Sequence, residues 1–152
     1  MKAPEPQTEH RWLQRLVGEW SAAMVGEEHP PWTESVRSLG EVWIVAETLG
    51  QMPDGGESRT LMSLGYDPAQ DRFVGVWIGS MMTHMWVYSG RLEGDVLTLD
   101  CEGPDFADTG RMARYQDIIE LKGDDLRTLT ARTQQADGSW KEFMVTEYRR
   151  KT

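Results

Sequence analysis

The chain has 152 residues, a formal net charge of −9 at pH 7 and one cysteine, Cys101. The length is that of one domain, and the acidity argues against nucleic acid and against a membrane surface as partners, because both select basic patches. A lone cysteine excludes an internal disulfide, and no apolar run is long enough to span a bilayer, so we expect a cytoplasmic protein.

The N-terminal region is expected to have two parts. Residues 1–9 are polar, contain two prolines and lack the apolar core of a signal peptide, which predicts a flexible tail ahead of one domain over residues 10–152. Thr8 is the expected N-cap of a short helix over residues 9–16. One face of that helix is apolar and carries Trp12, Leu13 and Leu16.

Ten short segments after the helix are typical of β-strands. Residues 42–49 are especially rich in β-branched and aromatic side chains. Turn sequences such as Glu93-Gly94-Asp95 and Asp137-Gly138 indicate hairpins, whereas residues 103–110 are expected to form a longer connection. The predicted strands are residues 19–25, 33–39, 42–49, 58–66, 72–78, 83–92, 96–101, 112–121, 126–134 and 140–149.

The even spacing of these strands indicates a sandwich or a barrel and excludes a doubly wound sheet. A short helix ahead of a long antiparallel meander favours a barrel that is closed at one end. We expect Trp12 and Leu16 to cover that end and Trp20 to pack beneath them.

Three motifs resemble a known family when they are taken in order. They are Leu16-Val17-Gly18-Glu19-Trp20, then Leu64-Gly65-Tyr66-Asp67-Pro68 followed by residues 73–78, and finally residues 137–143. In this order and spacing they resemble the bacterial domain-of-unknown-function 1579 family over residues 10–149. The resemblance implies an all-β fold, a single antiparallel barrel of the lipocalin-like or fatty-acid-binding-protein-like type, with about ten strands and a short N-terminal plug helix. It implies no catalytic residues.

The resemblance also bears on haem. The nitrobindin-like proteins, which are distant cousins of this barrel class, bind haem through a histidine near the C-terminal end. The chain has no histidine after His84, so the residue for that role is missing. We therefore expect no cofactor.

The titratable residues offer few candidates for chemistry. His10 and His29 are expected to be exposed, and no histidine or cysteine pair has the spacing of a metal site, so no metal is expected. Cys101 alternates with leucines and is expected to be a buried, inert thiol. His84 lies between two aromatic strands, where it is either a polar group at a cavity mouth or an ordinary strand histidine.

Glu47 shares the alternation of Trp43 and is a candidate inward-facing carboxylate. A buried carboxylate needs a partner, which Arg114 or Arg132 could supply. The result would be a structural ion pair or a polar anchor for a ligand, and the sequence does not separate the two.

Large aromatic side chains provide the best functional lead. The sequence has seven tryptophans and nine methionines, and Phe73, Gly75, Trp77 and Gly79 share one face of a strand. Glycines between large aromatics indicate either free volume or bulges, and a narrow barrel can also be filled by its own side chains. Both a cavity and a filled core remain open at this point.

The sequence favours a non-enzymatic binder of a small, mostly apolar ligand. The expected ligand-binding residues are Trp43, Glu47, Trp77, His84, Trp86 and Tyr115. One alternative is an enzyme that acts on a small hydrophobic substrate with His84 as general base. The other is a homodimeric interaction protein with a filled barrel and exposed aromatic residues.

Overall fold

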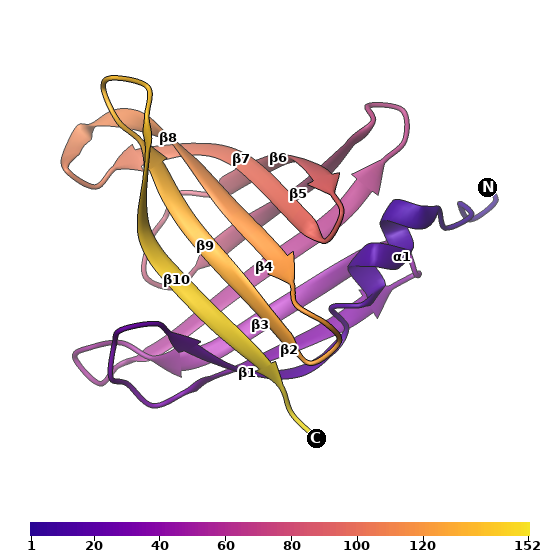
Figure 1. Ribbon diagram of the computed structural model, residues 1–152, viewed down its shortest axis with the longest axis horizontal. Helices are drawn as coiled ribbons and strands as arrows, with labels where there is room; N and C mark the ends of the chain where they lie inside the picture. Colours follow the sequence, from indigo (N-terminus) through magenta and orange to yellow (C-terminus); the bar gives the residue numbers. More distant parts are fainter.

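The computed structural model describes the backbone of residues 1–152 and every side chain except that of Thr109. The elements are α1 (Thr8–Gln14), β1 (Gly18–Met24), β2 (Trp32–Leu39), β3 (Trp43–Gln51), β4 (Glu57–Asp67), β5 (Arg72–Gly79), β6 (Trp86–Glu93), β7 (Val96–Asp105), β8 (Asp108–Leu121), β9 (Leu126–Gln134) and β10 (Trp140–Arg150). Every strand is antiparallel to its neighbours, and β1 pairs with both β2 and β10, which closes the barrel (Figure 1). The predicted antiparallel barrel with an N-terminal helix is confirmed.

Alternation of side chains separates the inside of the barrel from its outside. In β9, Arg127, Leu129 and Ala131 are buried, and the residues between them are only partly buried. The hairpin turns use glycines at positive φ, as at Gly94 (φ 61°) and Gly138 (φ 87°), where other residues would be strained. The sequence therefore specifies both the strands and their reversals.

The largest difference from the predicted strands lies between β7 and β8. Residues 103–110 were expected to form a long connection. Instead, residues 103–105 extend β7 and residues 108–110 extend β8, with a turn at 106–107 and a register shift between Pro104 and Asp105. The Tyr115 hydroxyl donates a hydrogen bond to the Pro104 carbonyl at 2.6 Å, which ties the extension of β7 to β8. A proline is tolerated here because the ladder is already irregular at this point. Residues 83–85, predicted as strand, belong to the connection before β6.

The helix α1 closes one end of the barrel. Trp12, Leu13 and Leu16 are buried, and Trp20 packs beneath them with its Nε1 donating to the Leu16 carbonyl at 2.8 Å. This arrangement confirms the predicted plug. Among the described residues, no helix combines the length and the apolar sequence that a bilayer span requires.

The N-terminus of α1 differs from its prediction in two ways. The N-cap is Gln7 rather than Thr8, because Gln7 and His10 form a reciprocal capping box. His10 was expected to be exposed but is buried, and its Nε2 lies 2.9 Å from the Tyr66 carbonyl oxygen. The histidine thus links the helix to β4.

The barrel has a closed half and an open half. In the closed half, next to α1, the apolar side chains of Trp20, Phe73, Leu97 and Leu99 are fully buried. Ile44, Leu64 and Ile119 are buried as well and form the inner boundary of the cavity described below. The open half lies toward the connections β1–β2, β3–β4, β5–β6, β7–β8 and β9–β10, at the end away from α1 (Figure 1). This second half contains the site described next.

Candidate functional site

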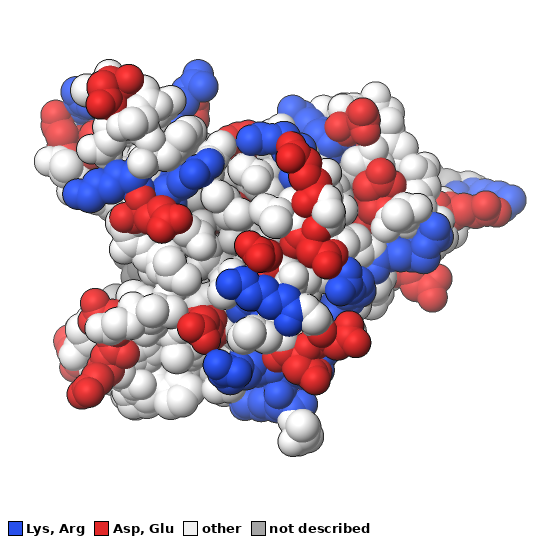
Figure 2. Space-filling view, in the orientation of Figure 1, with Lys and Arg blue, Asp and Glu red and all other residues white. Residues whose placement is uncertain are grey.

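A cavity of about 880 Å³ opens at the end of the barrel away from α1 and reaches inward to Leu16, Ile44 and Leu64 beneath the helix. Its rim is formed by residues from four of the five connections of that end, including His29, Met52, Met81 and Phe106, and by Phe143 of β10. In the space-filling view, uncharged side chains form the inner and lower margins of the recess at the left edge, whereas acidic and basic side chains lie along its upper margin (Figure 2). Acidic and basic side chains are interspersed over the rest of that face. The sequence left open whether the interior is filled, and the structure contains a cavity.

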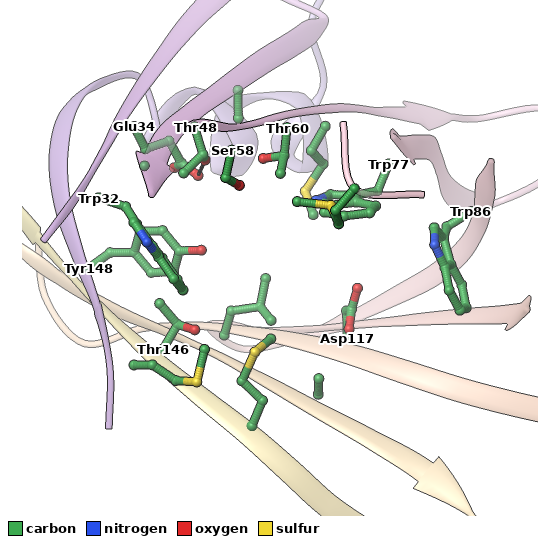
Figure 3. A pocket seen from close by; sticks show the side chains of 18 of the residues that line it. Trp32, Glu34, Thr48, Ser58, Thr60, Trp77, Trp86, Asp117, Thr146 and Tyr148 are labelled. Atoms are coloured by element: carbon green, nitrogen blue, oxygen red, sulfur yellow. Dashed lines mark hydrogen bonds between the residues drawn. The ribbon is translucent and has the colours of Figure 1, made fainter. Parts of the chain in front are cut away.

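Glycines shape the cavity by making room for tryptophan rings. A side chain at Gly50 would collide with Trp32, and one at Gly103 would collide with Trp86. Both tryptophans belong to the cavity wall, together with Trp77 (Figure 3). The rings therefore lie close against neighbouring strands and leave the centre of the barrel free.

The floor of the cavity holds a buried ion pair. Arg127 of β9 pairs with Glu34 of β2, and the Thr48 hydroxyl donates to the second oxygen of Glu34 at 3.0 Å. The Arg127 guanidinium lies over the Tyr148 ring at 3.8 Å and over the Trp20 ring at 4.7 Å. Burial lowers the pKa of Arg127 to about 10, so the residue remains a cation at neutral pH. Both charges at the floor are thus matched.

A second carboxylate, that of Asp117, lies halfway up the wall. The Tyr88 hydroxyl donates to Asp117 Oδ2 at 2.5 Å. Burial raises the pKa of Asp117, and the hydrogen bond from Tyr88 acts in the opposite direction. Burial and the charge of Asp117 also raise the pKa of Tyr88 well above its usual range, so the phenol stays protonated. The carboxylate points into the cavity (Figure 3).

An aromatic cluster forms one side of the rim. Trp86 and Tyr115 meet edge to face with ring centroids 5.1 Å apart, and Phe106 and Phe143 lie 5.6 Å and 6.2 Å from Tyr115. Trp86 Nε1 donates to the sulfur of Met82 at 3.0 Å, so its polar edge is satisfied within the wall. The cluster therefore gives this side of the rim an apolar, aromatic surface.

The sequence matches the family described as "Protein of unknown function (DUF1579)" over residues 5–150. The chain belongs to this family. No curated protein matches it. Among solved structures, Rv2717c from M. tuberculosis is similar, with a TM-score of 0.61 and 13% identity over 97% of this chain and 100% of the other. Because the identity is low, this likeness shows the fold alone.

Two further solved structures resemble this DUF1579 protein more distantly. A redesigned beta barrel, b11L5F_LGL, has a TM-score of 0.49 and 12% identity over 93% of this chain and 96% of its own. EF1p2_mFAP2b bound to DFHBI has a TM-score of 0.49 and 12% identity over 95% of this chain and 100% of its own.

Three of the six predicted ligand-binding residues of this DUF1579 protein line the cavity. They are Trp77, Trp86 and Tyr115, from β5, β6 and β8. Trp77 and Trp86 are direct partners across the β5–β6 ladder, which brings them together on one wall. Cys101 is also buried at this wall, which confirms the expected burial, and burial raises the pKa of its thiol to about 12.

Trp43 and Glu47 face the outside of the barrel. Glu47 pairs with Arg37 at 2.9 Å in an exposed position, so the expectation of an inward carboxylate with an Arg114 or Arg132 partner is wrong. Strand β3 carries apolar residues on both faces, so alternation alone could not identify the buried face. The Trp43 ring lies over Gly65 of β4, where only a glycine leaves room for it.

The histidines lie away from the centre of the cavity. His84 is half-buried beside the wall, its Nε2 2.9 Å from the Glu102 carbonyl oxygen, and it does not line the cavity. His29, expected to be exposed, is half-buried at the rim, where it stacks on Trp32 at 4.5 Å and accepts the Met24 N–H. No group of three metal-binding side chains occurs among the described residues.

Sequence reasoning missed the charged residues of the interior. Each of them shares its strand face with buried or partly buried apolar residues: Glu34 with Trp32 and Val36, Asp117 with Tyr115 and Ile119, and Arg127 with Leu129 and Ala131. This alternation, which was tested only for Glu47, could have found all three. Their mutual pairing could not be found in this way, because it depends on which strands meet across the barrel.

Proposed function

We propose that this protein is a non-enzymatic binder of a small, mostly apolar molecule, which occupies the barrel cavity. The cavity itself carries the proposal: its volume of about 880 Å³ lies within the range of small-molecule sites. Its wall combines tryptophan and methionine side chains with a few polar groups, which is the usual composition of such sites.

The arrangement of the charged groups favours binding over catalysis. Glu34 and Arg127 neutralise each other at the floor, and the Tyr88 and Cys101 side chains are held in their protonated forms. His84, which was considered as a general base, is bonded to a backbone carbonyl outside the cavity lining. A catalytic base needs to reach its substrate within hydrogen-bond distance.

Cavity filling tests the proposal. The uncharged fluorescent probe N-phenyl-1-naphthylamine is titrated into the wild-type protein and into Ala131→Leu, which adds apolar volume at the cavity wall. We expect affinity to fall at least about tenfold, because the added side chain takes up space that the probe needs. Ala46→Leu, at another position of the wall, is a second variant in case the first disturbs folding.

The matched control is Ala23→Leu, because Ala23 is exposed on the outer face of β1. It should bind the probe as the wild type does. Equal affinities in all four proteins would place the probe outside the barrel and contradict the proposal. Native mass spectrometry of freshly purified protein would then show whether any molecule is retained from the cell.

A further inference from the structure

The cavity has no free positive charge for an anionic ligand. Arg127 is the only lysine or arginine of the cavity lining within the described part of the chain. Its charge is matched by Glu34, and its guanidinium is covered by the rings of Tyr148 and Trp20. Its Nε is buried and has no hydrogen-bond partner among the described residues. An anion would have to break this pair, which is costly in a buried site.

Asp117, by contrast, is a carboxylate without a cationic partner. Among the described side chains, Tyr88 alone donates to it, on Oδ2, and no salt bridge involves it. Asp117 lies four residues before Leu121 on β8, and Leu121 is paired with Arg127 of β9. The backbone positions of Asp117 and Arg127 are therefore about 13 Å apart along the strand direction. The cross-strand neighbours of Asp117 are Leu99 and Ala131, neither of which can offer a charge.

Aromatic side chains accompany this carboxylate along the same wall. Tyr88 contacts it directly, and Tyr115 precedes it by two residues on the same face of β8. Trp77 and Trp86 belong to β5 and β6, which β7 separates from β8, and Figure 3 shows Trp77 above Asp117 and Trp86 to its right, in the same part of the cavity. The faces of such rings attract cations, most strongly where water is excluded.

The mouth of the cavity is negatively charged, as is the Asp117 carboxylate. Glu27 and Glu28 of the β1–β2 connection border the cavity, and the whole chain has a net charge of −9. A field of this sign concentrates cations at the opening and repels anions.

From these contacts we infer that the cavity selects an organic cation: a small, largely apolar molecule with a protonated amine that pairs with Asp117 between the aromatic side chains of β5, β6 and β8. The inference rests on the proposed function, since it names the chemical class of the ligand for the same cavity. The same argument excludes apolar acids as ligands. Their carboxylate would lie near the Asp117 carboxylate, and none of the described lining residues is an unpaired lysine or arginine that could bind it.

Three probes with one skeleton test the inference. They are 2-(1-naphthyl)ethylamine, 2-(1-naphthyl)ethanol and 1-naphthylacetate, each titrated into the protein by calorimetry at pH 7. We expect the amine to bind at least about tenfold more tightly than the alcohol, because it gains a charged hydrogen bond and contacts with ring faces. The acetate is expected to bind more weakly than the alcohol.

The variant Asp117→Asn removes the charge and keeps the size of the side chain. The amine should lose at least about tenfold in affinity, whereas the alcohol should stay within about twofold, which also shows that the variant is folded. Glu47→Gln is the control, because it makes the same change of net charge on the outer surface and should leave all three affinities unchanged.

The outcomes separate the two proposals. If the alcohol binds as tightly as the amine, if the acetate binds most tightly, or if the amine preference survives in Asp117→Asn, the choice of a cation is overturned while cavity binding stands. If none of the three probes binds and N-phenyl-1-naphthylamine does not bind either, the proposed function itself fails.

Discussion

The closed and open halves of the barrel differ in what their interiors contain: apolar side chains in the first, and charged groups around a cavity in the second. Below α1, side chains such as Trp20, Leu97 and Leu99 are fully buried in one apolar cluster. The cavity that opens at the other end is bordered by two carboxylates and a guanidinium, and the ion pair among them lies at the boundary of the two halves, next to Trp20. Apolar burial supplies the main favourable term of folding, whereas buried charges oppose it unless they are paired. Stability is therefore concentrated in one half and the candidate site in the other.

The largest effect should come from a tryptophan exchange that compares the two halves. Trp20→Ala removes a fully buried ring, the hydrogen bond to Leu16 and the face that contacts Arg127, and should lower the free energy of unfolding by about 5 kcal/mol. Trp77→Ala, at the cavity wall, should lose only about 1–2 kcal/mol because one face of the ring already borders free space. Urea denaturation followed by circular dichroism measures both. Equal losses would contradict the division into two halves.

The next effect concerns the ion pair at the floor. Arg127→Met leaves Glu34 buried without a cation and should cost about 3–4 kcal/mol. Adding Glu34→Leu removes the stranded charge, so the double variant should recover more than half of the loss. The same denaturation experiment measures all three proteins. A double variant less stable than Arg127→Met would show that the pair is not the source of the cost.

The sequence predicts the closed half much better than the open half. Hairpin turns, strand alternation and the apolar face of α1 are local signals, and they correctly indicated ten strands and a plug that packs over Trp20. The fold class follows from them, because consecutive antiparallel strands need only their turns and faces to be specified. The predictions were wrong where tertiary contacts determine the structure. At Pro104 the proline alone argued against a strand, but the hydrogen bond from the Tyr115 hydroxyl holds this segment in β7.

The open half depends on partners that lie far apart in the sequence. Glu34 and Arg127 are separated by 93 residues, and no local pattern connects them. The aromatic residues Trp77, Trp86 and Tyr115 were found because large mid-strand rings are visible locally. Glu47 was misplaced because both faces of β3 carry apolar residues. Alternation thus identifies candidates for the interior, and only the closed barrel shows which of them meet.

A smaller, pH-dependent effect on stability is expected from Asp117, the interior carboxylate without a cationic partner among the described residues. Burial raises the pKa of Asp117 in the folded state above that of an unfolded chain. The folded protein therefore takes up this proton first as pH falls, so Asp117 penalises folding at neutral pH and the penalty disappears below the unfolded pKa. Asp117→Asn should raise the free energy of unfolding at pH 7, with a gain that shrinks toward pH 4.

Thermal unfolding of both proteins between pH 4 and pH 8 measures this difference, in which all other titrating groups cancel. A constant difference across that range would mean that Asp117 keeps its ordinary pKa in the fold. A gain that grows at low pH would reverse the sign and indicate an unrecognised cationic partner.

The smallest effect is expected on the outer surface. Glu47 and Arg37 are both about half exposed in their pair, so water already solvates each charge and Glu47→Gln should change the free energy of unfolding by less than about 0.5 kcal/mol. Its effect should also shrink further in 1 M salt, because exposed charges are screened. Urea denaturation at low and high salt tests both statements, and a loss of several kcal/mol would show that the pair is structural. Removal of one carboxylate thus has three different consequences in this barrel. The change in stability depends on whether the carboxylate is solvated, as at Glu47, paired with a buried cation, as at Glu34, or left facing a cavity, as at Asp117.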